Sequence, residues 1–142
     1  MTFVLDASVT MAWLLGDARP SDRAYAARVL ETLKQPELAV EVPLTWALEV
    51  ANVIARAESR RMISEAHSEA FLEMLANFPI AADHATFTTA LSDTLQLARR
   101  YRLSSYDASY LELALRRALP IASVDADLNK AALKAGVKRF AR

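Results

Sequence analysis

Two short apolar segments, one near each end of the chain, stop at an aspartate and strongly limit the possible folds. Residues 2–5 precede Asp6, and residues 120–124 precede Asp125. Both segments have the length and the β-rich composition of buried strands, such as those of a parallel sheet. Groups beyond the carboxyl ends of such strands gather at one edge of the sheet. We therefore expect the two aspartates at the same edge.

The remaining sequence alternates between short strands and helices. Strands are predicted at residues 38–42 and 79–82, with an edge strand at 137–141. Helices are predicted at residues 8–15, 21–33, 43–59, 64–78, 84–101, 105–119 and 126–135. This alternation predicts an α/β fold with a mostly parallel central sheet. Because 142 residues suit one domain, residues 1–142 are expected to form a single domain.

Composition narrows the class of protein. A hydrophobic content of 54% excludes a disordered chain. The absence of cysteine excludes disulfides and thiolate metal sites, and it fits a reducing compartment. The N-terminus has no basic segment, and Asp6 interrupts its apolar stretch, which argues against a signal peptide. No uncharged apolar run approaches the roughly 18 residues of a membrane span. We therefore expect a cytoplasmic protein.

The formal net charge is zero, but basic and acidic residues are separated along the sequence. Residues 1–98 hold 7 basic and 13 acidic side chains, whereas residues 99–142 hold 10 basic and 4 acidic ones. Arg99 and Arg102, in the basic part, are candidates for contacts with an RNA backbone. The alternative is a set of solvated helix faces, and charge alone favours that alternative because the whole chain is neutral.

Four acidic residues occupy positions that surface decoration explains poorly: Asp6, Glu49, Asp107 and Asp125. Asp107 opens a predicted helix, and Glu49 is an isolated charge in a span rich in Leu, Ala and Val. Carboxylates this far apart in sequence meet only through folding, and together they repel unless a cation lies among them. Mg²⁺ or Mn²⁺ is the natural partner, because both ions prefer oxygen ligands.

Each of these acids also has an ordinary structural explanation. Asp6 and Asp125 stand where they can cap the following helices, and Glu49 can lie on a solvated helix face. Asp107 follows Ser104 with the spacing of a capping box, in which an acid of the first turn interacts favourably with the helix dipole. The same arrangement recurs at two strand ends and two helix starts, and this recurrence favours a shared site.

Four segments carry a resemblance to a known family. They are residues 4–8 (VLDAS), 49–53 (EVANV), 103–114 (LSSYDASYLELA) and 122–125 (ASVD). In this order they resemble a PIN-domain protein, specifically a VapC-type ribonuclease toxin of a bacterial toxin–antitoxin system. The resemblance spans the whole chain, and its most specific part is the segment from Tyr106 to Leu111.

The resemblance implies an α/β/α sandwich and a Mg²⁺- or Mn²⁺-dependent endoribonuclease. By motif position, Asp6 and Asp107 are implied as the principal metal ligands, and Glu49 and Asp125 complete the catalytic acidic pocket. Four further polar residues are implied as its support: Ser8, Asn52, Ser123 and Asp127. Asp127 is implied either as a cap or as a ligand of a second metal ion.

The resemblance also implies partners. Related toxins form homodimers, cleave particular tRNAs or an rRNA loop, and are inhibited by a VapB-type antitoxin whose C-terminal segment lies in a groove between helices. Apolar residues of the first two helices are candidates for burial by a partner, with ordinary core packing as the equal alternative. They are Trp13, Leu14, Leu15, Val29, Leu30 and Leu33.

Three other functions remain open for this sequence. A PIN-fold binding module with an inactive pocket is disfavoured by the complete set of four acids. A PIN nuclease of RNA processing or decay would work without an antitoxin. A phosphatase of the haloacid dehalogenase type would use Asp6 as its nucleophile, but such enzymes usually carry a second acid two residues later, where this chain has Ser8.

Overall fold

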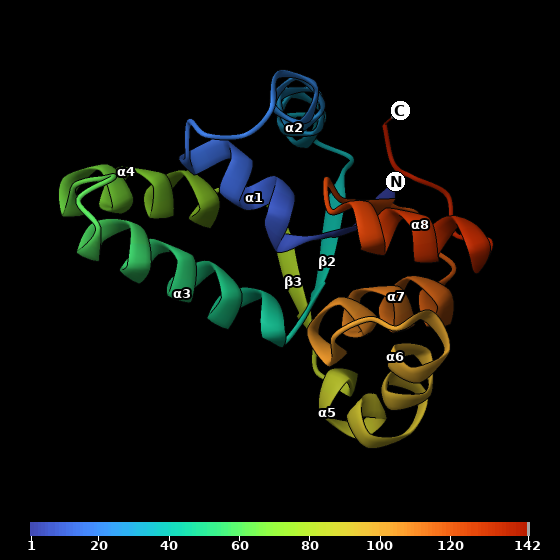
Figure 1. Cartoon of the computed structure of the whole chain (residues 1–142). Helices are drawn as coiled ribbons and strands as arrows, with labels where there is room; N and C mark the ends of the chain where they lie inside the picture. The colour runs from blue at the N-terminus through green and yellow to red at the C-terminus, as the bar shows by residue number, and fades with distance from the viewer. Residues whose placement is uncertain (142) are drawn as a thin grey trace.

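The structure is a computed structural model that describes residues 1–141 (Figure 1). Its centre is a four-stranded sheet with the order β3-β2-β1-β4, in which every neighbouring pair is parallel. The strands are β1 (Thr2–Leu5), β2 (Ala39–Pro43), β3 (Ile80–Asp83) and β4 (Ile121–Ala122). The predicted α/β class with a parallel sheet is confirmed.

Helices surround this sheet on both faces. They are α1 (Ala7–Leu14), α2 (Pro20–Leu33), α3 (Thr45–Ser59), α4 (Glu65–Ala76), α5 (Ala85–Thr89), the π-helix η1 (Ala90–Thr94), α6 (Leu95–Tyr101), α7 (Ser105–Arg117) and α8 (Ala126–Lys134). Figure 1 shows α1 and α2 on one side of the strands and α7 with α6 on the other. The implied α/β/α sandwich is therefore present.

Alternation along β1 explains the two layers of core. Phe3 and Leu5 belong to the apolar cluster under α2, whereas Val4 belongs to the cluster that contains Tyr110 and Leu111 of α7. Successive side chains of a strand point to opposite faces, so one fully buried strand serves both clusters. This burial keeps β1 rigid, and Asp6 directly follows it.

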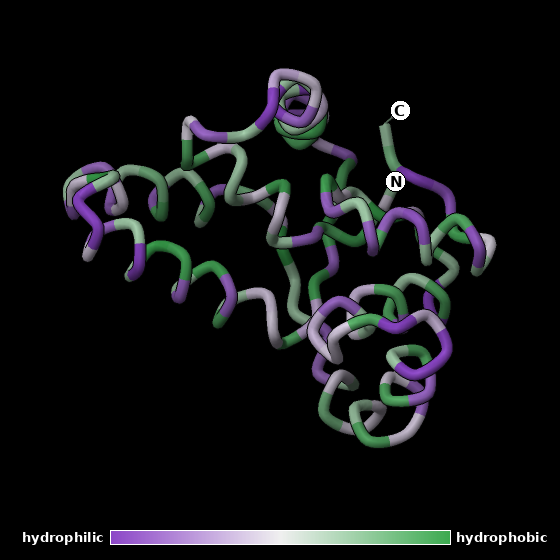
Figure 2. Tube along the Cα trace, in the orientation of Figure 1, coloured by the Kyte–Doolittle hydropathy of each residue, from purple (hydrophilic) through white to green (hydrophobic). Residues whose placement is uncertain are grey.

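A third apolar cluster packs α3 and α4 against α1. Figure 2 shows hydrophobic and hydrophilic residues alternating along α3, as expected for a helix with one buried face. Within residues 1–141, no helix is both long and apolar enough to cross a membrane.

The apolar faces of the first two helices turn out to be core. Leu14, Val29 and Leu33 are buried against the sheet or α3. Trp13 donates its indole hydrogen to the Ala26 carbonyl at 2.7 Å and packs edge-on against Phe78. Core packing thus explains Trp13, Leu14, Val29 and Leu33, and Leu15 packs against the third cluster while partly exposed. Leu30 is half-buried and belongs to none of the three clusters of the described residues, so its burial by a partner stays a prediction.

The strand β4 covers Ile121–Ala122 and is shorter than the predicted strand at residues 120–124. Nearby side chains form hydrogen bonds with the backbone groups that follow it. The Ser123 carbonyl accepts hydrogen bonds from Asn129 and Arg139, and the Val124 amide donates to Ser8 Oγ. A backbone that is satisfied in this way does not extend the strand ladder. The predicted edge strand at 137–141 is reduced to one parallel bridge between Ile121 and Arg139.

The predicted helix 84–101 is interrupted by the π-helix. At its start, Thr89 Oγ1 bonds the Ala85 carbonyl at 3.2 Å and Glu112 Oε1 at 3.0 Å, and Thr94 Oγ1 donates to Thr89 Oγ1 at 3.4 Å. Hydroxyls that bond nearby backbone and side chains compete with the regular helical ladder. Apolar spacing alone did not reveal this break.

Candidate functional site

Asp6 lies between β1 and α1 and is only 3% exposed. It occupies the N-cap position of α1, but its side chain makes no cap hydrogen bond. Instead, Asp6 Oδ2 accepts hydrogen bonds from Ser8 Oγ at 2.5 Å and Ser123 Oγ at 2.8 Å. Simple capping is therefore the wrong explanation for Asp6, and two of the expected supporting residues contact it directly.

Electrostatics connect Asp6 with the other acids. Burial raises the pKa of Asp6 to about 6, the two serine hydroxyls oppose this rise, and the charges of Glu49 and Asp125 add to it. The Asp6 amide donates to the Ala122 carbonyl at 2.9 Å, which ties the end of β1 to the end of β4. The expectation that Asp6 and Asp125 share one edge of the sheet is confirmed.

Asp125 combines capping with membership of this acidic group. It is the N-cap of α8, and its Oδ1 accepts from the Leu128 amide at 2.8 Å. Its own amide donates to Ser123 Oγ at 3.0 Å, while that hydroxyl donates to Asp6. Ser123 therefore fixes the two aspartates relative to each other.

Asp107 lies in the first turn of α7, whose N-cap is Ser104. Ser104 Oγ accepts from the Asp107 amide at 3.1 Å, which confirms the predicted cap by the serine. Burial raises the pKa of the Asp107 carboxyl to about 6, and the charges of Asp125, Asp6 and Asp127 add to the rise. Asp107 thus belongs to the same acidic group.

Glu49 enters the group from α3 and is held by a residue that the sequence did not single out for function. Tyr110, fully buried on α7, donates its hydroxyl to Glu49 Oε1 at 2.7 Å. Burial raises the pKa of Glu49, the Tyr110 hydrogen bond opposes this rise, and the Asp107 charge adds to it. Burial and the charges of Asp6 and Glu49 raise the pKa of the Tyr110 hydroxyl, which therefore keeps its proton. The signal for Tyr110 was its position one helical turn after Asp107.

The other expected residues lie at the rim. Asn52 is exposed and lines a surface cavity of about 440 Å³ together with Glu49 and Tyr106. Thr45, Glu49 and Asn52, which lie four and three residues apart along α3, all line this cavity, so the polar side of α3 faces a cleft. Asp127 is exposed in the first turn of α8, where Asp125 already provides the cap. The negative charge of Asp127 repels that of Asp107 and helps to raise the pKa of the Asp107 carboxyl.

The carboxylates of Asp6, Glu49 and Asp125 accept hydrogen bonds from neutral donors. Within residues 1–141, every salt bridge involves other residues, so no Lys or Arg neutralises the group. In the same residues, no three His, Cys, Asp or Glu side chains are already arranged as a metal site. The donor set nevertheless fits a hard divalent cation, because it consists of partly buried carboxylates whose mutual repulsion a cation would relieve.

Arg99 and Arg102 occupy different places at the end of α6. Arg99 is exposed in the last turn, whereas Arg102 is the C-cap and has a left-handed backbone, with φ 55°. Arg102 lines a cavity shared with α8, and Arg99 is not among the lining residues. The structure thus separates two arginines that the sequence grouped together.

Comparison with known proteins agrees with this architecture. Residues 3–134 match the model of the PIN domain family. The crystal structure of PAE2754 from Pyrobaculum aerophilum is similar, with a TM-score of 0.64 over 92% of this chain and 84% of that chain. Its sequence identity is 18%, so this likeness concerns the fold alone. No curated protein matches the sequence. PIN domains are generally nucleases that use divalent metal ions, and this chain belongs to the PIN-domain family.

Proposed function

We propose that this protein is a Mg²⁺- or Mn²⁺-dependent endoribonuclease and the toxin of a VapBC-type pair in the cytoplasm. The observation that carries the proposal is the acidic group itself. Asp6, Glu49, Asp107 and Asp125 come from four separate segments, yet their charges act on one another without a basic partner among residues 1–141. Mutual repulsion of these carboxylates lowers the stability of the fold, but a metal-dependent nuclease needs such carboxylates to hold its cation.

The proposed reaction is hydrolysis of an RNA phosphodiester. Water attacks phosphorus, the bond from phosphorus to the leaving oxygen breaks, and that oxygen takes up a proton. When bound, the divalent ion stabilises charge on the phosphate and makes water a better nucleophile. Asp6 and Asp107 would be its principal ligands, with Glu49 and Asp125 completing the pocket.

This chain's own hydrogen bonds would orient those groups. Ser8 and Ser123 hold the Asp6 carboxylate, and Tyr110 holds Glu49. Glu49 or Asp125 would orient the attacking water, since each keeps a carboxylate oxygen beyond the one engaged by its hydrogen bond. Fixed ligands reduce the reorganisation needed in the transition state.

The toxin assignment adds two partners. An apolar groove of about 530 Å³ between α3 and α4 suits the C-terminal segment of a VapB-type antitoxin. Its walls include Trp46, Val50, Ile54, Leu72 and Phe78. For the homodimer, Phe87 and Leu91 are 86% and 88% exposed and lie four residues apart, which is an apolar surface that a second copy would cover.

Cleavage of total bacterial RNA by the purified chain tests the nuclease. We expect discrete fragments with Mg²⁺ or Mn²⁺, none with EDTA, and none from Asp6→Asn or Asp107→Asn. Asp17→Asn is the matched control, because Asp17 is an exposed acid in the turn after α1. A folded Asp107→Asn protein with full activity would refute the mechanism.

The toxin role has its own test. Expression should stop bacterial growth, and co-expression of a small gene immediately upstream should restore it. Cleavage without growth arrest or antitoxin rescue would instead favour a PIN nuclease of RNA processing. A folded protein that binds RNA but never cleaves it would favour the inactive binding module.

A further inference from the structure

A basic cavity of about 380 Å³ lies between the end of α6 and α8. Four cationic side chains line it: Arg100, Arg102, Lys130 and Lys134. Asp127 is the one acidic residue among the lining residues, which leaves three net positive charges. Within residues 1–141, none of the four cations takes part in a salt bridge. The cavity therefore presents charge that the described protein does not neutralise.

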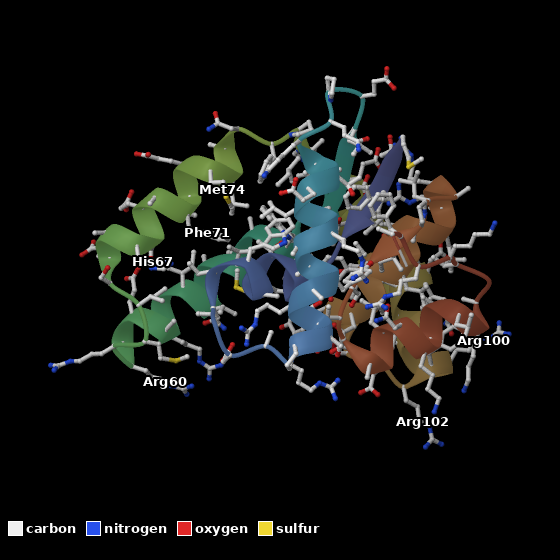
Figure 3. All side chains as sticks on the ribbon, turned by 90° about the horizontal axis from the view of Figure 1, so that it is seen from above. Arg60, His67, Phe71, Met74, Arg100 and Arg102 are labelled. Atoms are coloured by element: carbon white, nitrogen blue, oxygen red, sulfur yellow. The ribbon has the colours of Figure 1, made fainter. Side chains whose placement is uncertain are left out.

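Local structure brings these cations together. Lys130 and Lys134 are four residues apart on α8 and so share one helix face. Arg102 ends α6 in a left-handed conformation, which starts the turn toward α7. Figure 3 shows Arg100 and Arg102 on the same side of the molecule, beside α8, whereas Arg60 lies on the far side.

The ordinary explanation covers only part of this set. Cations in a last helical turn interact favourably with the helix dipole, and this accounts for Arg100 in α6 and Lys134 in α8. It does not account for Lys130 in the middle of α8 or for Arg102 beyond the last turn of α6. It also gives no reason for cations of two helices to line one cavity.

Asp127 connects the basic cavity with the acidic site. It lines the cavity, and it lies in the first turn of α8, two residues after Asp125 of the acidic group. An acidic site repels a polyanion, so a strand that reaches it needs attraction from an adjacent surface. Phosphate contacts from Lys and Arg supply such attraction and set the position of the strand without reading its bases.

We propose that the cavity of Arg100, Arg102, Lys130 and Lys134 binds a backbone phosphate of the RNA strand and holds that strand across the acidic site. The proposal rests on the proposed nuclease function for its substrate. It adds a subsite for a phosphate other than the one that is cleaved. It also assigns the binding to Arg102 and not to the exposed neighbour Arg99.

RNA binding without cleavage tests this subsite. A labelled single-stranded RNA is titrated in EDTA between 50 and 200 mM salt, and anisotropy gives the dissociation constant. Each lost phosphate contact should reduce the slope of log K against log salt by about 0.7. K130Q/K134Q should therefore lose affinity at low salt. If that one phosphate contact is lost, its further loss of affinity up to 200 mM should be about 2.6-fold smaller than that of wild type.

A matched double variant separates the cavity from general charge. R60Q/R61Q removes two exposed cations at the end of α3 and should keep the wild-type slope. An equal change in both doubles, or no change in K130Q/K134Q, would overturn the proposal. So would loss of poly-glutamate binding by K130Q/K134Q with RNA binding intact, since that result assigns the cavity to an acidic protein segment.

Asp127→Asn provides a change of opposite sign. It removes the acidic charge from the cavity lining and should tighten RNA binding in EDTA, whereas weaker binding would contradict the electrostatic argument. Because no metal is present, these results do not depend on catalysis. If the chain proves not to cleave RNA, the slopes of log K against log salt still test the subsite.

Discussion

Asp6→Asn should make the metal-free protein more stable at neutral pH. Burial is the first cause of the rise in the Asp6 pKa from 3.8 to about 6. A rise of that size corresponds to about 3 kcal/mol of unfolding free energy lost once the carboxyl is ionised. Asparagine has nearly the same shape without the charge. One amide oxygen in the place of Oδ2 still accepts from Ser8 and Ser123, because both hydroxyls bond that single atom.

The gain should depend on pH with a defined sign. Below pH 3.8 the carboxyl is protonated in both the folded and the unfolded chain, so Asp6 does not lower the unfolding free energy. Between pH 3.8 and about 6 the folded protein keeps a proton that the unfolded chain has released, and the loss grows. Above about pH 6 the whole loss is present, and the unfolding free energy of Asp6→Asn should exceed that of wild type by up to about 3 kcal/mol.

Thermal and denaturant unfolding in EDTA, from pH 4 to pH 8, measures this difference. At pH 7.5 the expected gain in Tm is roughly 10 °C for a chain of this size. Most of the gain should persist in 0.5 M NaCl, because burial of the carboxylate outweighs the neighbouring charges. Asp17→Asn should follow wild type at every pH. An Asp6→Asn protein that is less stable at pH 7.5, or equally shifted at pH 4 and pH 7.5, would refute the reasoning.

Three further predictions concern the same groups. Saturating Mg²⁺ should stabilise wild type by about 2.7 kcal/mol at 100 times its Kd, but Asp6→Asn much less, in thermal unfolding with and without EDTA. Tyr110→Phe removes the hydrogen bond to Glu49 and should lower stability by about 1–2 kcal/mol in urea unfolding and slow RNA cleavage; unchanged values for both would remove Tyr110 from the site. Glu112→Gln removes one of the two acidic partners of Arg116, which keeps Asp83, and should lower the unfolding free energy in urea by about 1.5 kcal/mol; an unchanged unfolding free energy would show that this pair contributes little.

The sequence predicted the sheet edge because its signal was local. Apolar runs that end at Asp6 and Asp125 specify buried parallel strands, and parallel strands bring such ends to one edge. The serine cap of Asp107 was also readable from its spacing, because a cap acts within a single helical turn.

Features that depend on distant partners could not be predicted. The partner of Tyr110 lies on another helix, so its position one turn after Asp107 did not show that its hydroxyl bonds Glu49. β4 is short because Arg139 and Asn129 bond the Ser123 carbonyl, and sequence spacing does not show such contacts. The break in helix 84–101 has a local sign, the threonines at 89 and 94, but its cause includes Glu112 from α7.

Arginines of α7 pair with acids outside the proposed site. Arg116 pairs with Glu112 and Asp83, and Arg117 pairs with Glu41 at 2.8 Å, so acids next to the sheet are neutralised by fixed arginines. Asp6, Glu49 and Asp125 are instead held by serine, tyrosine and amide donors, which orient a carboxylate without cancelling its charge. A fixed arginine among them would occupy the space and the charge that a divalent ion needs. Neutral donors keep the acids oriented and leave their charge available to an exchangeable cation. Because no arginine among residues 1–141 neutralises Asp6, its ionised form is predicted to destabilise the fold. A bound metal ion would relieve this destabilisation, which would favour metal binding.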